Sequence, residues 1–275
     1  MKSFLLATLV LIAGCSGCAT THPPFSIWGN TDDQGALFNQ RLMRQTVQVL
    51  QILNVITPES KTKGLGHLPE FGTGSIVASD IRAQESLVLT AGHVCVTPES
   101  HKTRLAEDGD PVELPVISST YKIQDIEGVW HDATVQSLDM SHDLCVLRIR
   151  KFVGPVAEVT SSMPPLGALL LNPSAPARTF MKWTVPVFEG YFSGFWKFKD
   201  MDEGDAMLVT SIPAMGGASG SGVYYQGKII GILTRVDSEF SHITYLVHAG
   251  HVVDILAEAK KNWLSSLKST SPSPK

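Results

Sequence analysis

The sequence contains little charge and no excess of positive charge. Only 17% of its 275 residues are charged, and 22 Lys and Arg stand against 26 Asp and Glu, for a formal net charge of −4. A nucleic-acid-binding surface needs a basic field, so no nucleic-acid partner is expected. Hydrophobic residues make up 43% of the chain, which is enough for a core and excludes a wholly disordered protein.

The apolar stretch at the N-terminus is too short to cross a membrane. It runs from Phe4 to Ala13, about ten residues, whereas a membrane-spanning helix needs about twenty. Because Lys2 precedes it, the stretch is typical of the hydrophobic region of an export signal.

Cysteine is scarce, and two of the four cysteines follow this stretch. Its ending, Ile12-Ala13-Gly14-Cys15, resembles the lipobox of bacterial lipoproteins. The resemblance implies a signal peptide at 1–14 and a lipid-modified Cys15 that anchors the mature chain in a membrane. In bacterial lipoproteins an Asp directly after the modified Cys favours retention in the inner membrane. Here Ser16 takes that position, so the resemblance favours the outer membrane and an exported cell-envelope protein is expected. A plain secretory signal is the alternative, and Cys15 and Cys18 lack the second Cys/His pair that a metal site needs.

Strand signals dominate the central part of the chain, and helical signals do not alternate with them. Gln226-Gly227, between two apolar runs, predicts a hairpin turn. This order favours two packed antiparallel barrels or a sandwich and excludes a doubly wound α/β fold. The predicted strands are Thr46–Ile56, Gly72–Ser79, Ser86–Thr90, Val129–Leu138, Leu144–Arg150, Thr184–Phe192, Ala206–Ile212, Gly222–Tyr225, Lys228–Arg235 and His242–Val247.

The segments on either side of these strands complete the predicted organisation. Residues 15–45 are polar and mixed and are interpreted as a tether, with a helix expected around Gly35–Arg44. In His251–Leu267, apolar residues recur every three or four positions, which predicts a helix with one apolar face. Residues 268–275 are predicted to be a disordered tail, which leaves 46–267 as the folded domain.

Three short segments carry residues suited to acyl transfer. Leu89–His93 ends an apolar run in a histidine, Asp143 immediately precedes another apolar run, and Ser219 lies in a glycine-rich stretch before a third. A serine hydroxyl is a weak nucleophile, and it needs a base whose ring is oriented by a third group. Glycines beside the serine allow successive N–H groups to face one developing oxyanion.

These segments jointly resemble those of the chymotrypsin-like (trypsin-like) serine peptidases of the bacterial single-chain type. Gly217–Gly220 is similar to the family's serine loop, and Leu89–His93 to its histidine segment. His142–Ile149 is similar to its aspartate strand, and Gly72–Val77 to the strand before the histidine. The order His, Asp, Ser and the separations of 50 and 76 residues also fit. The resemblance implies an all-β fold of two packed six-stranded antiparallel β-barrels with a C-terminal helix.

The resemblance also implies a role for each matching residue. His93 is expected to be the general base, Asp143 its orienting group and Ser219 the nucleophile, with an oxyanion hole formed by the N–H groups of Gly217 and Ser219. Ser221 is the rival nucleophile and Asp139 the rival acid. The nucleophile elbow of an α/β-hydrolase requires a Gly both two residues before and two residues after the serine. Ser219 has Gly217 before it but Ser221 after it, and Ser221 has Ser219 before it, so neither serine fits.

Two features qualify this reading. Ala218 stands where digestive members of the family have an Asp that pairs with a newly formed N-terminus, so no activation by N-terminal insertion is expected. Cys95 follows His93 by two residues, and Cys145 follows Asp143 by two. If the two segments meet, the two thiols lie close together, and the oxidising environment of an exported protein allows them to form a disulfide. Two buried free thiols are the alternative.

Specificity is poorly defined by the sequence. By resemblance, Pro213 and Thr234-Arg235-Val236 border the pocket for the residue before the cut. Pro213 carries no charge, so a preference for basic residues is not expected, whereas Arg235 or His248 would favour an acidic one. His248 and His251 have metal-ligand spacing but lack a third ligand, so structural roles are preferred, and no metal or organic cofactor is expected.

The leading hypothesis is a membrane-tethered serine endopeptidase that acts on protein or peptide substrates. A catalytically inactive binding lipoprotein with the same fold is the alternative, and a purely structural or surface-modifying lipoprotein is a third. The sequence does not define the oligomeric state.

Overall fold

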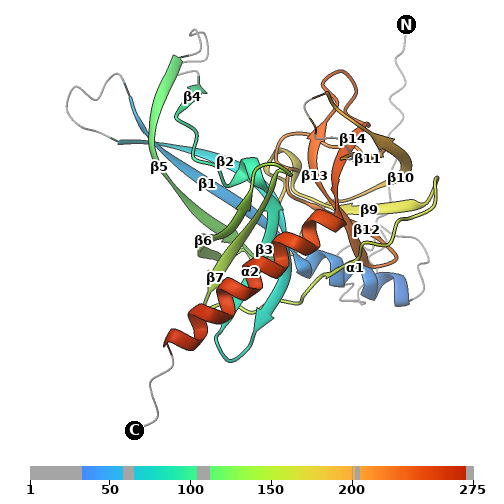
Figure 1. The fold of residues 1–275 in the computed structure, drawn as a ribbon, viewed down its shortest axis with the longest axis horizontal. Coiled ribbons are helices and arrows are strands. Elements are labelled where there is room, and N and C mark those ends of the chain that lie inside the picture. The colour runs from blue at the N-terminus through green and yellow to red at the C-terminus, as the bar shows by residue number, and fades with distance from the viewer. Residues whose placement is uncertain (1–32, 58–64, 104–111, 200, 202–204, 271–275) are drawn as a thin grey trace, which may run out of the picture.

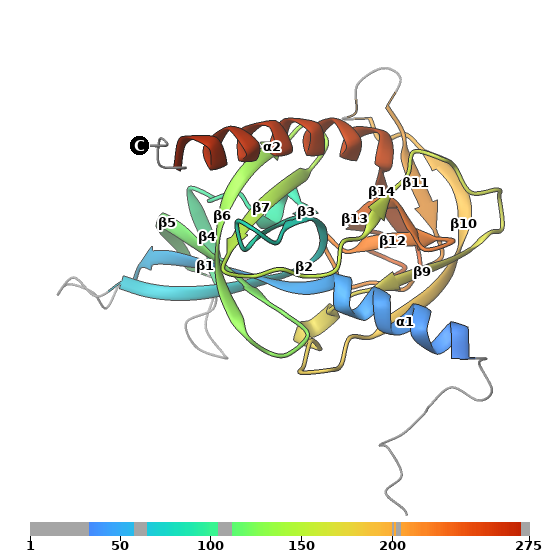
Figure 2. The ribbon, with the colours of Figure 1, turned by 90° about the horizontal axis from the view of Figure 1, so that it is seen from below.

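The protein folds into two β-barrels that pack side by side, with a long C-terminal helix across both (Figures 1 and 2). The structure is a computed structural model, and it describes residues 33–57, 65–103, 112–199, 201 and 205–270. Its two sheets have seven strands each, and in each sheet six strands close into a ring. The predicted fold class is therefore confirmed.

In the first barrel the six strands of the ring follow the order β1-β2-β3-β7-β6-β5, and β5 pairs back onto β1. A short strand, β4, pairs only with β5 at the edge. All these pairings are antiparallel. The bounds are β1 Thr46–Ile56, β2 Leu65–Asp80, β3 Glu85–Ala91, β4 Ser100–Thr103, β5 Val112–Gln124, β6 Trp130–Asp139 and β7 Leu144–Arg150.

In the second barrel the ring follows the order β12-β9-β10-β11-β14-β13, and β13 pairs back onto β12. The predicted hairpin turn at Gln226-Gly227 joins these last two strands, and both of its residues have positive φ, as a type I′ turn requires. The bounds are β8 Glu158–Val159 (parallel to β13), β9 Leu169–Pro173, β10 Val187–Trp196, β11 Met207–Thr210, β12 Gly222–Tyr225, β13 Lys228–Val236 and β14 Thr244–His248.

Three apolar clusters hold the barrels together. One fills the first barrel around Val88 and Leu147, and another fills the second around Leu208 and Ile230. The third lies between the barrels and the C-terminal helix. Strand β3 is buried along its whole length because Leu87 and Leu89 face this third cluster while Val88 faces the barrel interior.

Two α-helices flank the barrels. Helix α1, Asp33–Gln45, packs through the buried Leu42, and helix α2, Ala249–Thr270, contacts β6 and β7 of the first barrel and β13 and β14 of the second. The buried side chains of α2, from Val252 to Trp263, follow the predicted apolar face. No helix in the described part of the chain is long and apolar enough to span a membrane.

Several predicted boundaries were wrong. The C-terminal helix begins before His251 and continues to Thr270, so the first residues of the predicted tail are helical. The strand expected at Thr184–Phe192 lies at Val187–Trp196. Strands β4, β5, β8 and β9 were missed, because β4, β8 and β9 are at most five residues long and β5 contains Pro115 and the polar run Ser118-Ser119-Thr120. The helix expected around Gly35–Arg44 is present.

Candidate active site

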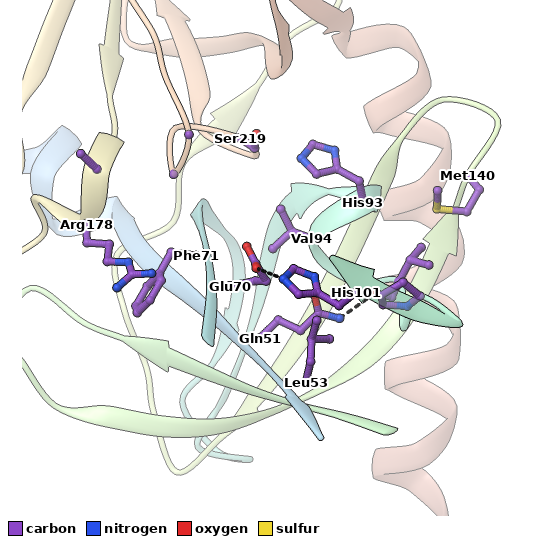
Figure 3. Close-up of a pocket in the computed structure, with 15 residues that line it drawn as sticks. Gln51, Leu53, Glu70, Phe71, His93, Val94, His101, Met140, Arg178 and Ser219 are labelled. Atoms are coloured by element: carbon purple, nitrogen blue, oxygen red, sulfur yellow. Dashed lines mark hydrogen bonds and ion pairs between the residues drawn. The ribbon is translucent and has the colours of Figure 1, made fainter. Parts of the chain in front are cut away.

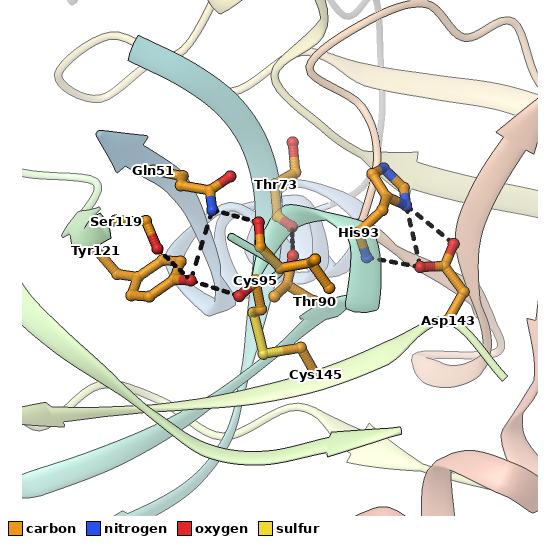
Figure 4. Close-up of a disulfide and its surroundings, with 10 residues drawn as sticks. Gln51, Thr73, Thr90, His93, Cys95, Ser119, Tyr121, Asp143 and Cys145 are labelled. Atoms are coloured by element: carbon orange, nitrogen blue, oxygen red, sulfur yellow. Dashed lines mark hydrogen bonds and ion pairs between the residues drawn. A yellow bond between two sulfur atoms is a disulfide. The ribbon is translucent and has the colours of Figure 1, made fainter. Parts of the chain in front are cut away.

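His93 and Asp143 form a tight pair at one end of the first barrel. The imidazole Nδ1 lies 2.9 Å from Oδ2 and 3.1 Å from Oδ1 of Asp143. The same carboxylate accepts the backbone N–H of His93 at 2.7 Å. The carboxylate therefore fixes both the main chain and the ring of His93 (Figure 4), and Nε2, the other ring nitrogen, makes no hydrogen bond to the described residues.

Strand pairing brings these two residues together. In the antiparallel pair β3–β7, Ala91 at the end of β3 is opposite Leu144 at the start of β7. His93, two residues after β3, therefore lies close to Asp143, which directly precedes β7. Gly92 allows the close approach, because a Cβ there would lie 2.9 Å from the backbone of Asp143 and Leu144. Its N–H donates to the carbonyl of Asp143 at 2.8 Å. A short 3₁₀ turn, Gly92–Val94, then orients His93.

A disulfide joins Cys95 to Cys145 directly behind this pair (Figure 4). Their Cα atoms are 6.4 Å apart, and both residues are buried. The predicted bridge is therefore present in the structure. It closes a loop of 50 residues, for which chain entropy alone contributes about 4 kcal/mol to stability. Because it starts two residues after His93 and ends two after Asp143, it also ties their segments together.

Ser219 belongs to the second barrel, in the loop before β12. Its carbonyl accepts the backbone N–H of Thr73 at 2.8 Å, and the Thr73 hydroxyl donates to the carbonyl of Gly217 at 2.7 Å. The Thr73 hydroxyl in turn accepts the N–H of Ala175 at 3.0 Å. One buried threonine of the first barrel thus holds the serine loop of the second.

The backbone around Ser219 presents two amide donors. Gly217 has φ +98° and Gly220 has φ +88°, a region that side chains other than glycine rarely adopt. The carbonyl of Gly216 accepts the N–H of Ala177 at 2.8 Å, so the N–H of Gly217, on the opposite side of the same peptide plane, points away from Ala177. Within the described part of the chain, neither this N–H nor that of Ser219 donates to a protein acceptor.

The rival residues lie in different surroundings. Ser221 is fully buried, and its hydroxyl accepts the side-chain N–H of Asn172 at 2.8 Å. Asp139 contacts His142, with 2.7 Å between Oδ2 and Nδ1, rather than His93. Ser219 is partly exposed, and among the described residues no hydrogen bond joins its hydroxyl to His93.

A cavity of about 740 Å³ opens beside His93 and Ser219 at the junction of the barrels (Figure 3). On its floor Phe71 lies under the guanidinium of Arg178, 4.4 Å from the ring centre. Glu70 pairs with His101 at 3.4 Å on its other side. Sequence reasoning missed these lining residues, although Phe71 directly precedes the glycine-rich strand that it singled out.

The residues expected to define specificity lie apart from this cavity. Thr234 and Arg235 instead line a second cavity, of about 320 Å³, together with Asp143. The Arg235 guanidinium lies over the ring of Phe198, 4.9 Å from its centre. Val236 is 39% exposed, and Pro213 is partly buried before the serine loop. The signal at 1–14, the lipidation at Cys15 and most of the tether lie outside the described residues.

Comparisons with known proteins agree with this architecture. A family model described as a trypsin-like peptidase domain matches residues 72–232, more than half of the chain. A search of curated proteins gave no match. Among solved structures, the chain is similar to the HtrA-type protease AlgW with a decapeptide, at 15% identity and a TM-score of 0.63. The similarity covers 82% of this chain and 66% of that one, slightly under two thirds, and it shows the fold.

Proposed function

Because the chain belongs to the trypsin-like peptidase family, we propose that it is a serine endopeptidase that works through an acyl-enzyme. The observation that carries the proposal is the His93–Asp143 pair, because its histidine lines the same cavity as Ser219 and Gly217. Each of these residues is the one expected from the motif resemblance. Two histidines line this cavity in the described part of the chain: His93 pairs with Asp143 at 2.9 Å, whereas His101 pairs with the exposed Glu70 at 3.4 Å.

The proposed reaction starts with attack of the Ser219 hydroxyl on the substrate carbonyl. Nε2 of His93 accepts the hydroxyl proton, and Asp143 holds Nδ1 and stabilises the imidazolium. The oxyanion receives hydrogen bonds from the N–H groups of Gly217 and Ser219. His93 then gives its proton to the leaving amine, and the C–N bond breaks. A water molecule, deprotonated by His93, releases the acyl group and regenerates the Ser219 hydroxyl.

A peptide segment is the proposed substrate. The cavity beside Ser219 has room for several side chains and combines apolar walls with charged groups of both signs. The related HtrA-type structure holds a decapeptide, which supports this substrate class. For the residue before the cut, we propose that uncharged Pro213 gives no basic preference. The Arg235 guanidinium contacts the ring of Phe198, which argues against a role for Arg235 in binding an acidic side chain of the substrate.

Attachment to a membrane is a separate proposal that rests on the lipobox resemblance. A lipid-modified Cys15 would place the barrels in the cell envelope, with the outer membrane favoured. Fractionation tests this directly: the wild-type chain should sediment with membranes, and a Cys15→Ser chain should not. Equal sedimentation of both chains would contradict the anchor, whereas a Cys18→Ser chain is the matched control and should behave as wild type.

Two observations favour a second candidate function, that of a non-catalytic binding protein. The described structure contains no hydrogen bond from Ser219 to His93, and Ala218 cannot take part in activation by a new N-terminus. In that case the cavity would bind a peptide without cleaving it.

A peptide-library cleavage assay separates the two functions. The endopeptidase proposal predicts cleavage by the wild-type chain and loss of at least about 10⁴-fold in kcat for Ser219→Ala or His93→Ala, because the residues act as a unit. Saturable peptide binding without cleavage by folded wild-type protein would favour the binding function instead. The profile of cut sites would also define the preferred residue.

A further inference from the structure

A second cluster of chemically active side chains lies next to the proposed catalytic pair. His142, Asp205 and His251 each offer one ligand atom, and these atoms all lie within 4.8 Å of one another. They come from three separate segments: the turn between β6 and β7, the residues before β11, and the first turn of α2. The cluster lines the cavity of about 320 Å³ that also contains Asp143.

Asp205 is the centre of this cluster. Its Oδ2 lies 3.7 Å from Nε2 of His142, and its Oδ1 lies 3.6 Å from Nε2 of His251. The two imidazole rings are stacked, 3.8 Å between centres and 19° between planes. Nε2 of both rings therefore faces the same carboxylate, so the three ligand atoms converge on one small volume.

The two ring nitrogens of His142 contact two different carboxylates. Nδ1 of His142 lies 2.7 Å from Oδ2 of Asp139, so the proton of a neutral ring lies on Nδ1 and the lone pair of Nε2 faces Asp205. A carboxylate that fixes the outer nitrogen of a metal-bound histidine is the usual second layer of such sites. Among the described residues, only the two histidines lie within ion-pair distance of Asp205.

From these contacts we propose that His142, Asp205 and His251 bind a divalent transition-metal ion, with Zn²⁺ as the preferred species. Two imidazoles and one carboxylate form a known ligand set for Zn²⁺, and the fourth position stays open to water or another ligand. A tetrahedral site needs ligand atoms about 3.4 Å apart, so modest side-chain rotations would complete it. From the sequence, structural roles were preferred for His248 and His251 because a third ligand was lacking. The fold places His142 and Asp205 beside His251, whereas Nδ1 of His248 accepts the N–H of Gly250 at 3.1 Å.

Isothermal titration with Zn²⁺ tests this site in a full-length chain that carries Cys15→Ser and Cys18→Ser, so that those thiols do not compete. One equivalent of Zn²⁺ should bind. His251→Gln and Asp205→Asn should each weaken binding by at least about 100-fold, and Asp139→Asn by about 10-fold through lost orientation of His142. His101→Ala removes a histidine whose pair with Glu70 has no third ligand among the residues that the structure describes, and it should leave Zn²⁺ binding unchanged.

A second measurement covers variants that lose stability. Co²⁺ added to the same chain should give the visible absorption of a tetrahedral site, and Zn²⁺ should abolish it. The proposal is overturned if folded wild-type protein binds no Zn²⁺, or if His251→Gln and Asp205→Asn bind it as tightly as the parent. Both readouts are independent of peptide cleavage, so this proposal and the proposed function can fail separately.

Discussion

At the scale of single residues, the site depends on which of several similar side chains occupy the right position. Asp143 and Asp139 are four residues apart, yet only Asp143 contacts His93, and Asp139 contacts His142. Ser219 and Ser221 are two residues apart, yet only Ser219 reaches the cavity. Turns make these distinctions: the β6–β7 turn, in which Asp143 has φ +53°, separates the two aspartates, and Gly220 with φ +88° separates the two serines.

Replacement of Asp143 by Asn tests the first distinction. The amide would still accept the backbone N–H of His93, but it would donate to Nδ1 and fix the wrong tautomer. We expect kcat to fall by roughly 10⁴-fold. Asp139→Asn is the matched control and should change kcat by less than about tenfold, the size of a single lost weak interaction. Equal losses in both variants would show that the assignment of Asp143 is wrong.

Gly217 offers a second matched pair. A Cβ at Gly217 would lie 2.7 Å from the carbonyl oxygen of Ala175, and its φ of +98° is strained for alanine. At Gly216 a Cβ meets nothing within 4 Å. Gly217→Ala should therefore displace its N–H and lower kcat/KM by roughly 100-fold, the effect of losing one oxyanion donor. Gly216→Ala should stay close to wild type, and a comparable loss there would argue against this role for Gly217.

At the scale of elements, α2 is fixed to the first barrel by a buried charge. Glu85 of β3 is 6% exposed, receives two hydrogen bonds from Arg148 of β7, and accepts the indole N–H of Trp263 in α2 at 2.6 Å. Burial opposes ionisation, but the hydrogen bonds from Arg148 and Trp263 hold the pKa of Glu85 below its ordinary value of 4.5. The ionised carboxylate therefore stabilises the docked helix.

This contact predicts a pH dependence of stability. Because the folded pKa is depressed, the contribution of Glu85 is present above the unfolded pKa and is lost as the pH falls through the folded pKa. Urea unfolding should show that Glu85→Gln lowers the free energy of unfolding near neutral pH and reduces its decline below about pH 4.5. Glu158→Gln, in an exposed pair with Lys228 at 3.4 Å, should change neither.

The elements differ in how far the sequence predicted them. Strand β1 was predicted with its observed bounds because its apolar run ends at turn-forming residues, and the turn at Gln226-Gly227 follows from its own chemistry. Strand β5 could not be predicted, since its alternation is weak and its pairing with β1 lies far away in sequence. The same limit explains why the cavity around Phe71 and Arg178 was missed, because its walls come from different barrels.

At the scale of the whole molecule, the proposed chemistry needs both barrels in one relative position. His93 and Asp143 belong to the first barrel, and Ser219 belongs to the second. The described hydrogen bonds from Thr73 to the serine loop cross between them. The triad expected from the order of motifs along the chain is therefore a property of how the barrels pack, and motif spacing alone does not specify that packing.

Thr73 provides the test of this packing. Thr73→Val would leave the buried N–H of Ala175 and the carbonyl of Gly217 without their partner, at a cost of about 1–3 kcal/mol for each buried group. We expect kcat/KM to fall by at least about tenfold, which is about 1.4 kcal/mol. Thr73→Ser keeps the hydroxyl and should restore most activity. Failure of serine to restore it would mean that the methyl contact, rather than the hydrogen bonds, aligns the barrels.

The central claim is that Ser219 is an activated nucleophile, and covalent labelling with a fluorophosphonate followed by peptide mass spectrometry tests it most directly. The account predicts a single label on Ser219 in the wild-type chain, the same label in Ser221→Ala, and none in Ser219→Ala. A label on Ser221, or no label on folded wild-type protein, would contradict it.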